Sequence, residues 1–225
     1  MSRPLAVWDV DGTLVDSRAT ITAAIQHGFR AIGREPPPYD RIRRIVGLSL
    51  GPALAELAPD LDADAQQALA QGYREHFWRL HGEPGFVEPL FPGAAETLAR
   101  LRREGWRIAM ATGKSRRGVE SVMRMHGWAD LFDSTHCAED GPGKPDPAML
   151  IEAMRALGSP PEATVMIGDT GHDMRMAKAA GVRAQGVAWG FHTAEEVAAA
   201  GADHVALTWG ELDAALDRFG AAVGN

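Results

Sequence analysis

The sequence of 225 residues contains little cysteine and little lysine. Its single cysteine, Cys137, excludes an intrachain disulfide and a cysteine-rich metal site. Only Lys114, Lys144 and Lys178 contribute lysine to the 23 basic residues, so each can be weighed individually. The net charge of −7 argues against a dedicated nucleic-acid binder, because such proteins usually present a basic face.

Long hydrophobic runs are also absent. No apolar run approaches the ~20 residues that span a membrane, and Asp9 interrupts the chain before the apolar core of a signal peptide develops. A nearly cysteine-free chain suits a reducing compartment. We therefore expect a soluble cytoplasmic protein without a nucleic-acid or membrane partner. Its length suits one large domain or two small ones.

Short apolar segments alternate with segments of helical periodicity. Five segments predict buried strands, the last of them weakly: residues 5–10, 107–111, 163–168, 183–188 and 132–136. Six segments predict helices: residues 92–104, 115–126, 147–157, 172–180, 193–200 and 210–222. Because strands and helices alternate, we expect an α/β fold whose parallel sheet is covered by helices on both faces.

One region breaks this alternation, since residues 17–88 contain no convincing strand. Four segments there have helical periodicity: residues 21–32, 39–46, 50–57 and 63–80. Proline- and glycine-rich stretches at residues 35–38 and 82–85 punctuate them. We therefore predict a helical domain over residues 17–88, inserted into a sheet domain formed by residues 1–16 and 89–225.

Polar side chains lie at the ends of the predicted strands and in the loops beside them. They are Asp9, Asp11, Thr112, Gly113, Lys144, Asp169 and Asp173. Each residue has an ordinary explanation by itself, as a helix cap, a turn residue or a solvated charge. Open parallel sheets bind ligands at the carboxyl ends of their strands, so the whole set indicates one functional site.

The carboxylates of this set require a counter-charge. Asp9, Asp11 and Asp169 would repel one another strongly in a low-dielectric cleft. A divalent cation removes that repulsion, and a set of oxygen ligands favours Mg²⁺ over Zn²⁺. Lys144 adds positive charge, while the hydroxyl and amide at residues 112–113 can bind a tetrahedral oxyanion. These groups fit phosphoryl transfer with Mg²⁺ as cofactor.

A calcium-binding loop is the obvious competitor for an Asp-x-Asp-Gly sequence. Such a loop needs a bidentate glutamate at its twelfth position and glycine at its sixth. If Asp9 is the first position, Thr20 and Leu14 occupy those places. The calcium interpretation therefore fails.

The polar segments resemble, in order, the four motifs of the haloacid dehalogenase superfamily of phosphatases. Asp9-Val10-Asp11-Gly12-Thr13 is similar to the first motif, Thr112 to the second, Lys144 to the third, and Gly168-Asp169 with Asp173 to the fourth. The helical insert lies where the family's C1 cap lies. The short stretch between the second and third motifs leaves no room for the larger cap type. The resemblance implies a Rossmann-like core with an α-helical cap.

The resemblance also implies catalytic roles. Asp9 would be the nucleophile that forms an aspartyl-phosphate, and Asp11 the general acid and then the general base. The implied phosphate-binding residues are Asp9, Thr112, Gly113 and Lys144. Alternation along the first strand would send the side chains of residues 9 and 11 to the same side. Gly12 would let the chain turn so that both carboxylates face one phosphorus atom.

The magnesium ligands implied by the resemblance are Asp9, the backbone carbonyl of Asp11, and Asp169. Asp173 would support the metal shell and is placed to orient Lys144. The cofactor predicted for the whole site is therefore Mg²⁺.

The branch of the family follows from three positions. Dehalogenases lack an acid where this chain has Asp11, and phosphonate-cleaving members need a cap lysine that residues 17–88 do not contain. Sugar-phosphate mutases carry Gly-x-Ser-Arg in the cap, where this chain has Leu50 in place of the arginine. The remaining activity is hydrolysis of a small phosphomonoester, so the expected partner is a small phosphorylated metabolite. The sequence is most similar to the phosphoglycolate phosphatase group, and mutase and pyrophosphatase activities are the alternatives.

Several other residues are candidates for specificity: Arg43, Arg44, Gly47 and Ser49 in the cap. One hypothesis is that an arginine binds a substrate carboxylate, and the alternative is a solvated helix face. Lys114 either contributes to the cleft and to cap closure or is a solvated lysine at the start of a helix. The oligomeric state stays open between monomer and homodimer.

Phospho-accepting signalling modules share part of this pattern. Receiver domains also combine an acceptor aspartate, acidic metal ligands, threonine and lysine on a parallel sheet. They are shorter, have no inserted cap and need no acid two residues after the acceptor. A signalling module is therefore the less favoured alternative.

Overall fold

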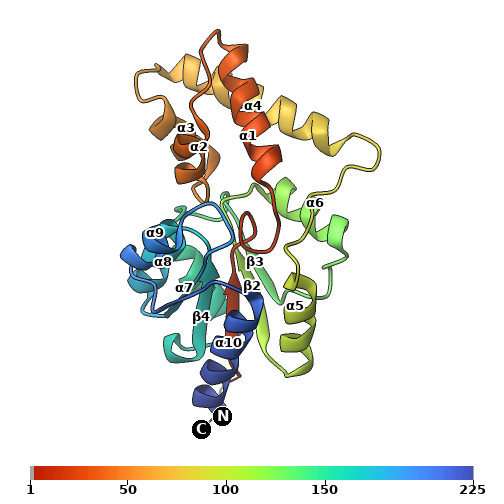
Figure 1. The fold of residues 1–225 in the computed structure, drawn as a ribbon, viewed down its shortest axis with the longest axis vertical. Helices are drawn as coiled ribbons and strands as arrows, with labels where there is room; N and C mark the ends of the chain where they lie inside the picture. The colour runs from red at the N-terminus through yellow and green to blue at the C-terminus, as the bar shows by residue number, and fades with distance from the viewer. Residues whose placement is uncertain (1–2, 225) are drawn as a thin grey trace.

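The computed structural model describes residues 3–224, which form a six-stranded parallel sheet with helices on both faces (Figure 1). The strands are β1 (Leu5–Trp8), β2 (Arg107–Ala111), β3 (Ser134–His136), β4 (Thr164–Gly168), β5 (Arg183–Val187) and β6 (His204–Ala206). Their spatial order is β3-β2-β1-β4-β5-β6. In the central strand β1, Leu5 lies opposite Arg107 of β2 and Thr164 of β4.

Strand β1 has no solvent-facing side. Leu5 and Val7 belong to the apolar cluster on one face of the sheet, while Ala6 and Trp8 belong to the cluster on the other. All four are fully buried. Helices cover both faces of the sheet, and the strand is therefore a continuous apolar run rather than an alternating one.

Two sets of helices cover the sheet (Figure 1). The face of Ala6 and Trp8 is covered by α5 (Ala94–Arg103), α6 (Arg116–His126) and α10 (Trp209–Gly224). The opposite face is covered by α7 (Ala148–Leu157), α8 (Gly171–Ala180) and α9 (Ala194–Ala199). Within residues 3–224, none of the helices has the length and apolar character needed to cross a membrane.

Four further helices lie together beyond the carboxyl ends of the strands (Figure 1). They are α1 (Arg18–Ala31), α2 (Tyr39–Ile45), α3 (Leu50–Leu57) and α4 (Ala63–His81). Helices α1 and α4 cross closely at two glycines. A Cβ atom on Gly72 would lie 3.1 Å from the Cα atom of Gly28, and one on Gly28 would lie 2.8 Å from the carbonyl oxygen of Leu69. Larger side chains would push these helices apart.

The four cap helices enclose their own apolar cluster, which includes Ile25, Phe29, Ile42, Leu54 and Leu69. Phe191, from the loop after β5, completes this cluster. A residue of the sheet domain therefore packs inside the cap.

The predicted fold class is confirmed, and each predicted helix and strand forms. β1 ends at Trp8 rather than at residue 10, and Ala163 lies in a 3₁₀ turn, η1 (Pro161–Ala163), rather than in β4. The sequence did not predict β6, whose three residues include two that are only partly buried. The domain limits at residues 16/17 and 88/89 stay a prediction.

The turn after β1 corrects one expectation. Asp9 and Asp11 follow the strand, so strand alternation does not orient their side chains. Instead the backbone carbonyl of Val10 accepts hydrogen bonds from the amides of Thr13, Leu14 and Val15 at 3.3, 3.0 and 2.9 Å. A compact turn therefore carries both carboxylates. Gly12 has a φ of +85°, and a Cβ atom there would lie 2.2 Å from Asp169 Oδ2, so only glycine fits.

Candidate active site

Asp9, Lys144 and Asp173 form a buried ionic cluster at the carboxyl edge of the sheet. Lys144 Nζ lies 2.8 Å from Asp9 Oδ1 and 2.6 Å from Asp173 Oδ1, and all three side chains are almost completely buried. Asp173 is also fixed by Thr170, whose hydroxyl and amide donate to Asp173 Oδ2 at 2.6 and 3.1 Å. Asp9 Oδ2 has no hydrogen-bond or ion-pair partner among residues 3–224.

Asp169 follows β4 and lies beside this cluster. Its Oδ1 atom accepts a hydrogen bond from the Thr13 hydroxyl at 2.8 Å, and its Oδ2 atom accepts one from the Phe191 amide at 2.7 Å. The first motif and the loop after β5 therefore both hold this carboxylate in place.

The surroundings of Asp9 and Asp169 raise the pKa of both carboxyl groups. Burial, only partly opposed by Lys144, raises the pKa of Asp9 to about 7. Burial and the carboxylates of Asp9 and Asp173 raise the pKa of Asp169 well above its usual range. Burial alone would lower the pKa of Lys144, but Asp173 and Asp9 outweigh it and hold that pKa above its ordinary value.

The carboxylates fit a hard divalent cation. Asp9, Asp169 and Asp173 each offer an oxygen atom, and these three atoms lie within 4.8 Å of one another. All three side chains are buried, one lysine cannot neutralise them, and Asp9 Oδ2 is unpartnered in the described chain. The absence of soft ligands suits Mg²⁺ in particular. The Asp11 side chain is not part of this group.

Thr112 and Gly113 follow β2 next to this cluster. Thr112 is fully buried, and its Oγ1 atom accepts a hydrogen bond from the Lys114 amide at 3.2 Å, which leaves its proton available to donate. Gly113 lies directly under the cap. A Cβ atom there would lie 2.6 Å from the carbonyl oxygen of Leu48 and 2.8 Å from that of Gly47.

Lys114 has a larger place in the site than the sequence indicated. Its Nζ atom lies 2.8 Å from Asp11 Oδ1 and 3.8 Å from Glu88 Oε2, with only 6% of the side chain exposed. Glu88 in turn lies 3.6 Å from His81 Nε2, at the end of α4. The interpretation as a solvated lysine is therefore wrong. Lys114 connects the predicted acid–base residue to the segment where the cap rejoins the core.

A cavity of about 310 Å³ lies between the cap and the core. Asp9, Asp11, Gly113 and Lys114 line it from the core. The cap side includes Gly47 and Ser49, which the sequence proposed for specificity. Ser49 Oγ is buried without a hydrogen-bond partner in the described chain and lies against the backbone at Gly143.

The structure does not bring Arg43 and Arg44 into the lining of this cavity. Arg43 lies at the boundary of cap and core, where its guanidinium contacts Glu196 of α9 at 2.6 Å and Asp40 at 2.7 Å. It also donates to the Phe191 carbonyl at 3.3 Å. Arg44 is mostly exposed and lies 3.1 Å from Asp40. Both arginines are thus occupied by protein carboxylates rather than directed at a substrate.

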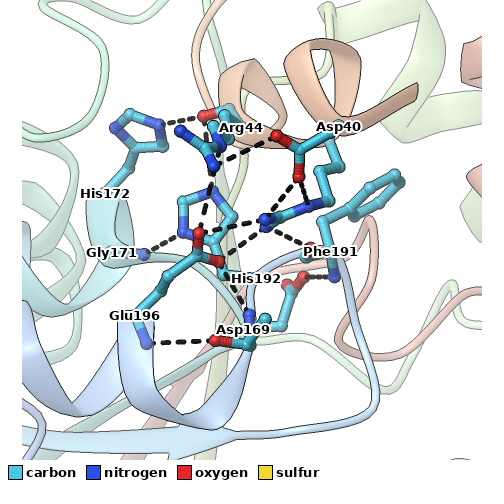
Figure 2. A network of polar contacts seen from close by, with 10 residues as sticks. Asp40, Arg44, Asp169, Gly171, His172, Phe191, His192 and Glu196 are labelled. Carbon is cyan, nitrogen blue, oxygen red and sulfur yellow. Dashed lines mark hydrogen bonds and ion pairs between the residues drawn. The ribbon is translucent and has the colours of Figure 1, made fainter. Parts of the chain in front are cut away.

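Two histidines of the core contact the same cap carbonyl. His172 Nε2 and His192 Nε2 lie 3.0 and 3.3 Å from the backbone oxygen of Arg44 (Figure 2). His192 Nδ1 accepts from the Gly171 amide, so its Nε2 atom carries the proton that it donates. Burial lowers the pKa of both histidines, which keeps them neutral near pH 7. Together with Arg43 and Glu196 they form the contact between cap and core that we call the latch.

Sequence reasoning missed the residues that support the predicted site. Phe191 holds Asp169 through its backbone amide, which no side-chain pattern announces. Glu88 was expected in a hinge at the domain boundary and not as a partner of Lys114. Lys114 had a usable signal, since it is one of three lysines and follows Thr112 by two positions.

The geometry is that of an α/β enzyme with an acidic, lysine-bearing site at the carboxyl edge of its sheet. Residues 4–181 match the family model described as haloacid dehalogenase-like hydrolase. The chain belongs to this family. The structure confirms the Rossmann-like core that the resemblance implied.

Known relatives support the same assignment. The "Probable phosphatase IndB" of Dickeya dadantii is 35% identical over 214 residues, which cover 93% of this chain and 92% of that protein. The phosphoglycolate phosphatase of Pseudomonas putida is 31% identical over 191 residues, 84% of this chain and 70% of that protein. These matches confirm the predictions of a phosphoric monoester hydrolase and of a likeness to phosphoglycolate phosphatases.

A solved structure extends the likeness to the three-dimensional level. CbbY from Rhodobacter sphaeroides, in complex with phosphate, superposes with a TM-score of 0.80 at 27% identity. The match covers 94% of this chain and 96% of that one.

Proposed function

We propose that this protein is a magnesium-dependent phosphatase that hydrolyses a small phosphomonoester through an aspartyl-phosphate on Asp9. The single observation that supports this most is the environment of Asp9. One oxygen of its carboxylate contacts Lys144, the other has no hydrogen-bond partner in the described chain, and Asp9 lines the cavity. An oriented carboxylate with a free oxygen is what a nucleophile at phosphorus requires.

In the first half-reaction, Asp9 Oδ2 attacks phosphorus and a new O–P bond forms. The bond between phosphorus and the leaving oxygen breaks, and the Asp11 carboxyl group donates its proton to that oxygen. Lys144 and the Thr112 hydroxyl hold oxygens of the transferring phosphoryl group. Lys114 fixes the Asp11 carboxylate at 2.8 Å, so the acid is oriented before substrate binds.

In the second half-reaction, water attacks the phosphorus of the aspartyl-phosphate. Asp11, now ionised, accepts the proton from that water, and Asp9 is released with its original oxygens. Phosphate leaves when the cap opens. Residues 17–88 act as this cap and exclude bulk water during the reaction.

Magnesium would be held by Asp9, Asp169 and the Asp11 backbone carbonyl, with Asp173 supporting the shell. When bound, it supplies positive charge that offsets the carboxylates and the phosphoryl oxygens. The raised pKa values of Asp9 and Asp169 support this proposal, because a cation would stabilise the ionised forms that the chemistry needs.

Phosphate release tests the proposal. The panel contains 2-phosphoglycolate, pyrophosphate, sugar phosphates and nucleoside monophosphates, each with Mg²⁺ and with chelator. Asp9→Asn removes the nucleophile with almost no change of shape, and Asp60→Asn is the matched control on the exposed cap surface. We expect release that needs Mg²⁺, persists in Asp60→Asn and is absent from Asp9→Asn.

Two results would contradict the proposal. Phosphoryl groups moved within a sugar phosphate without release would point to a mutase. A stable phosphorylated Asp9 without turnover would point to a signalling module.

A further inference from the structure

The cavity above Asp9 has an apolar wall on its cap side. Six residues dominate this wall: Ile21, Ile25, Ile45, Leu54, Tyr73 and Phe77. The rings of Tyr73 and Phe77 lie parallel within 17°, with centroids 5.8 Å apart. The volume of about 310 Å³ is at the lower end of the ~300–1,000 Å³ of pockets that hold drug-sized molecules. This is more room than a two-carbon acid needs.

Among the described residues that line the cavity, Arg74 is the one cation without an ion pair, and it is exposed. The charged residues among those that line it are Asp9, Asp11, Arg74, Lys114 and Glu139. Lys114 is already matched by Asp11 and Glu88, and Lys144 by Asp9 and Asp173. Arg74 and Glu139 are exposed and of opposite sign.

A carboxylate placed against the apolar wall would lose its hydration without gaining a partner. It would also face the carboxylates of Asp9 and Asp11. Two other cap arginines lie outside the cavity, where Arg43 contacts Glu196 and Arg44 contacts Asp40. The electrostatic cost therefore falls selectively on acidic substrates.

We infer that the substrate is a phosphomonoester of an uncharged, ring-bearing alcohol, and that esters of small acids such as phosphoglycolate are poor substrates. This inference rests on the proposed function. The ring lies against Tyr73 and Phe77, while the phosphoryl group reaches Asp9. Contact between the ring and the apolar wall then removes apolar surface from water, which stabilises the complex, and no charge is buried without a partner.

Two esters of primary alcohols test the inference. Benzyl phosphate carries a neutral ring, and 2-phosphoglycolate carries a carboxylate. We expect kcat/KM with Mg²⁺ to be at least ~10-fold higher for benzyl phosphate, the scale of discrimination that an apolar pocket provides. The same order of affinities is expected for Asp9→Asn by titration calorimetry, where no turnover occurs.

A charge placed on the wall should change this preference. Leu50 is a partly buried lining residue at the start of α3. Leu50→Arg supplies the missing cation, and Leu50→Gln is the matched uncharged variant. We expect the ratio of kcat/KM for phosphoglycolate to that for benzyl phosphate to rise at least ~10-fold in Leu50→Arg relative to Leu50→Gln. As a second variant, Tyr73→Ala should lower kcat/KM for benzyl phosphate several-fold more than for phosphoglycolate.

The outcomes separate this inference from the proposed function. Faster turnover of phosphoglycolate by the wild type would overturn the inference and leave the phosphatase standing. No release from either ester, with tighter binding of benzyl phosphate to Asp9→Asn, would overturn hydrolysis and leave the ring-binding cavity standing. No release and no binding preference would overturn both.

Discussion

Lys144 and Lys114 each join a proposed catalytic carboxylate to a second acid, and both pairings lie almost fully buried. Breaking a buried ion pair by removing one partner costs about 3–5 kcal/mol of stability, because the remaining charge is buried with neither an ion partner nor water to solvate it. The same contacts orient Asp9 and Asp11. Stability and chemistry therefore depend on the same side chains at this site.

Replacement of Lys114 should act through Asp11. Lys114→Met leaves the Asp11 carboxylate without its 2.8 Å contact, so we expect kcat to fall by about tenfold or more. In the Asp11→Asn background the same replacement should have little further effect, because the two residues act as a unit. Steady-state kinetics of the wild type, Lys114→Met, Asp11→Asn and the double variant give the coupling between the two residues in kcat. Independent effects of the two substitutions would show that Lys114 acts elsewhere.

The cap segment at residues 47–49 and the core loop at Gly113 are the elements in closest contact over the site. Their backbones touch because Gly113 has no side chain, as the distances of 2.6 and 2.8 Å from its virtual Cβ atom to the carbonyl oxygens of Leu48 and Gly47 show. Beside this cap segment, the latch ties α2 to α9. The sequence predicted the elements on both sides but not the contacts between them, which depend on tertiary placement.

A methyl group on Gly113 should hold the cap away from the core. We expect Gly113→Ala to lower kcat/KM by ~10-fold or more, because cap and core cannot approach as closely. Gly210→Ala in α10 is the matched control, since Gly210 does not line the cavity and the nearest atom to its added methyl, Thr208 Oγ1, lies 4.0 Å away. Phosphate-release kinetics measure both. Equal activity of the two variants would mean that the contact at Gly113 has no part in turnover.

The latch should stabilise the fold in a pH-dependent way. The hydrogen bonds from Arg43 lower the pKa of Glu196 to about 2, from an ordinary value of 4.5. Its contribution is therefore complete above about pH 4.5 and is lost as the pH falls from there towards 2. Solvent reaches part of this pair, so Glu196→Gln should cost roughly 1 kcal/mol or less at neutral pH.

Urea unfolding at pH 7 and pH 3 measures this effect. The difference between wild type and Glu196→Gln should shrink at the lower pH, while Glu120→Gln, at an exposed position outside the latch, should behave as wild type at both. A difference that grew as the pH fell would contradict the assignment of the lowered pKa to Arg43.

At the scale of the whole molecule, the sequence specified most of the sheet and the order of the motifs. Buried strands such as β2 (Arg107–Ala111) were visible because both faces of the sheet are covered and the strand is continuously apolar. β6 was not visible because a strand of three residues is too short to form an apolar run. Two of the three residues are also only partly buried, at the edge of the sheet. Likewise, the support of Asp169 by Phe191 comes from a backbone amide brought in by a loop.

Magnesium should stabilise the whole molecule. A ligand that binds only the folded state adds about 2.7 kcal/mol of stability at a concentration of about 100 times its Kd. We therefore expect Mg²⁺ to raise the thermal unfolding midpoint of the wild type and of Asp60→Asn, but not that of Asp169→Asn. Scanning calorimetry with Mg²⁺ and with chelator gives this comparison. An equal shift in all three proteins would place the cation outside the cluster of Asp9, Asp169 and Asp173.

The covalent state of Asp9 during turnover tests the central proposal most directly. The enzyme, mixed with Mg²⁺ and the best substrate of the panel, is quenched in acid within the first turnover and digested for mass spectrometry. We predict one added phosphoryl group on the peptide that contains Asp9, absent with chelator and absent from Asp9→Asn. Rapid phosphate release with an unmodified Asp9 at every quench time would contradict the nucleophilic role of this residue.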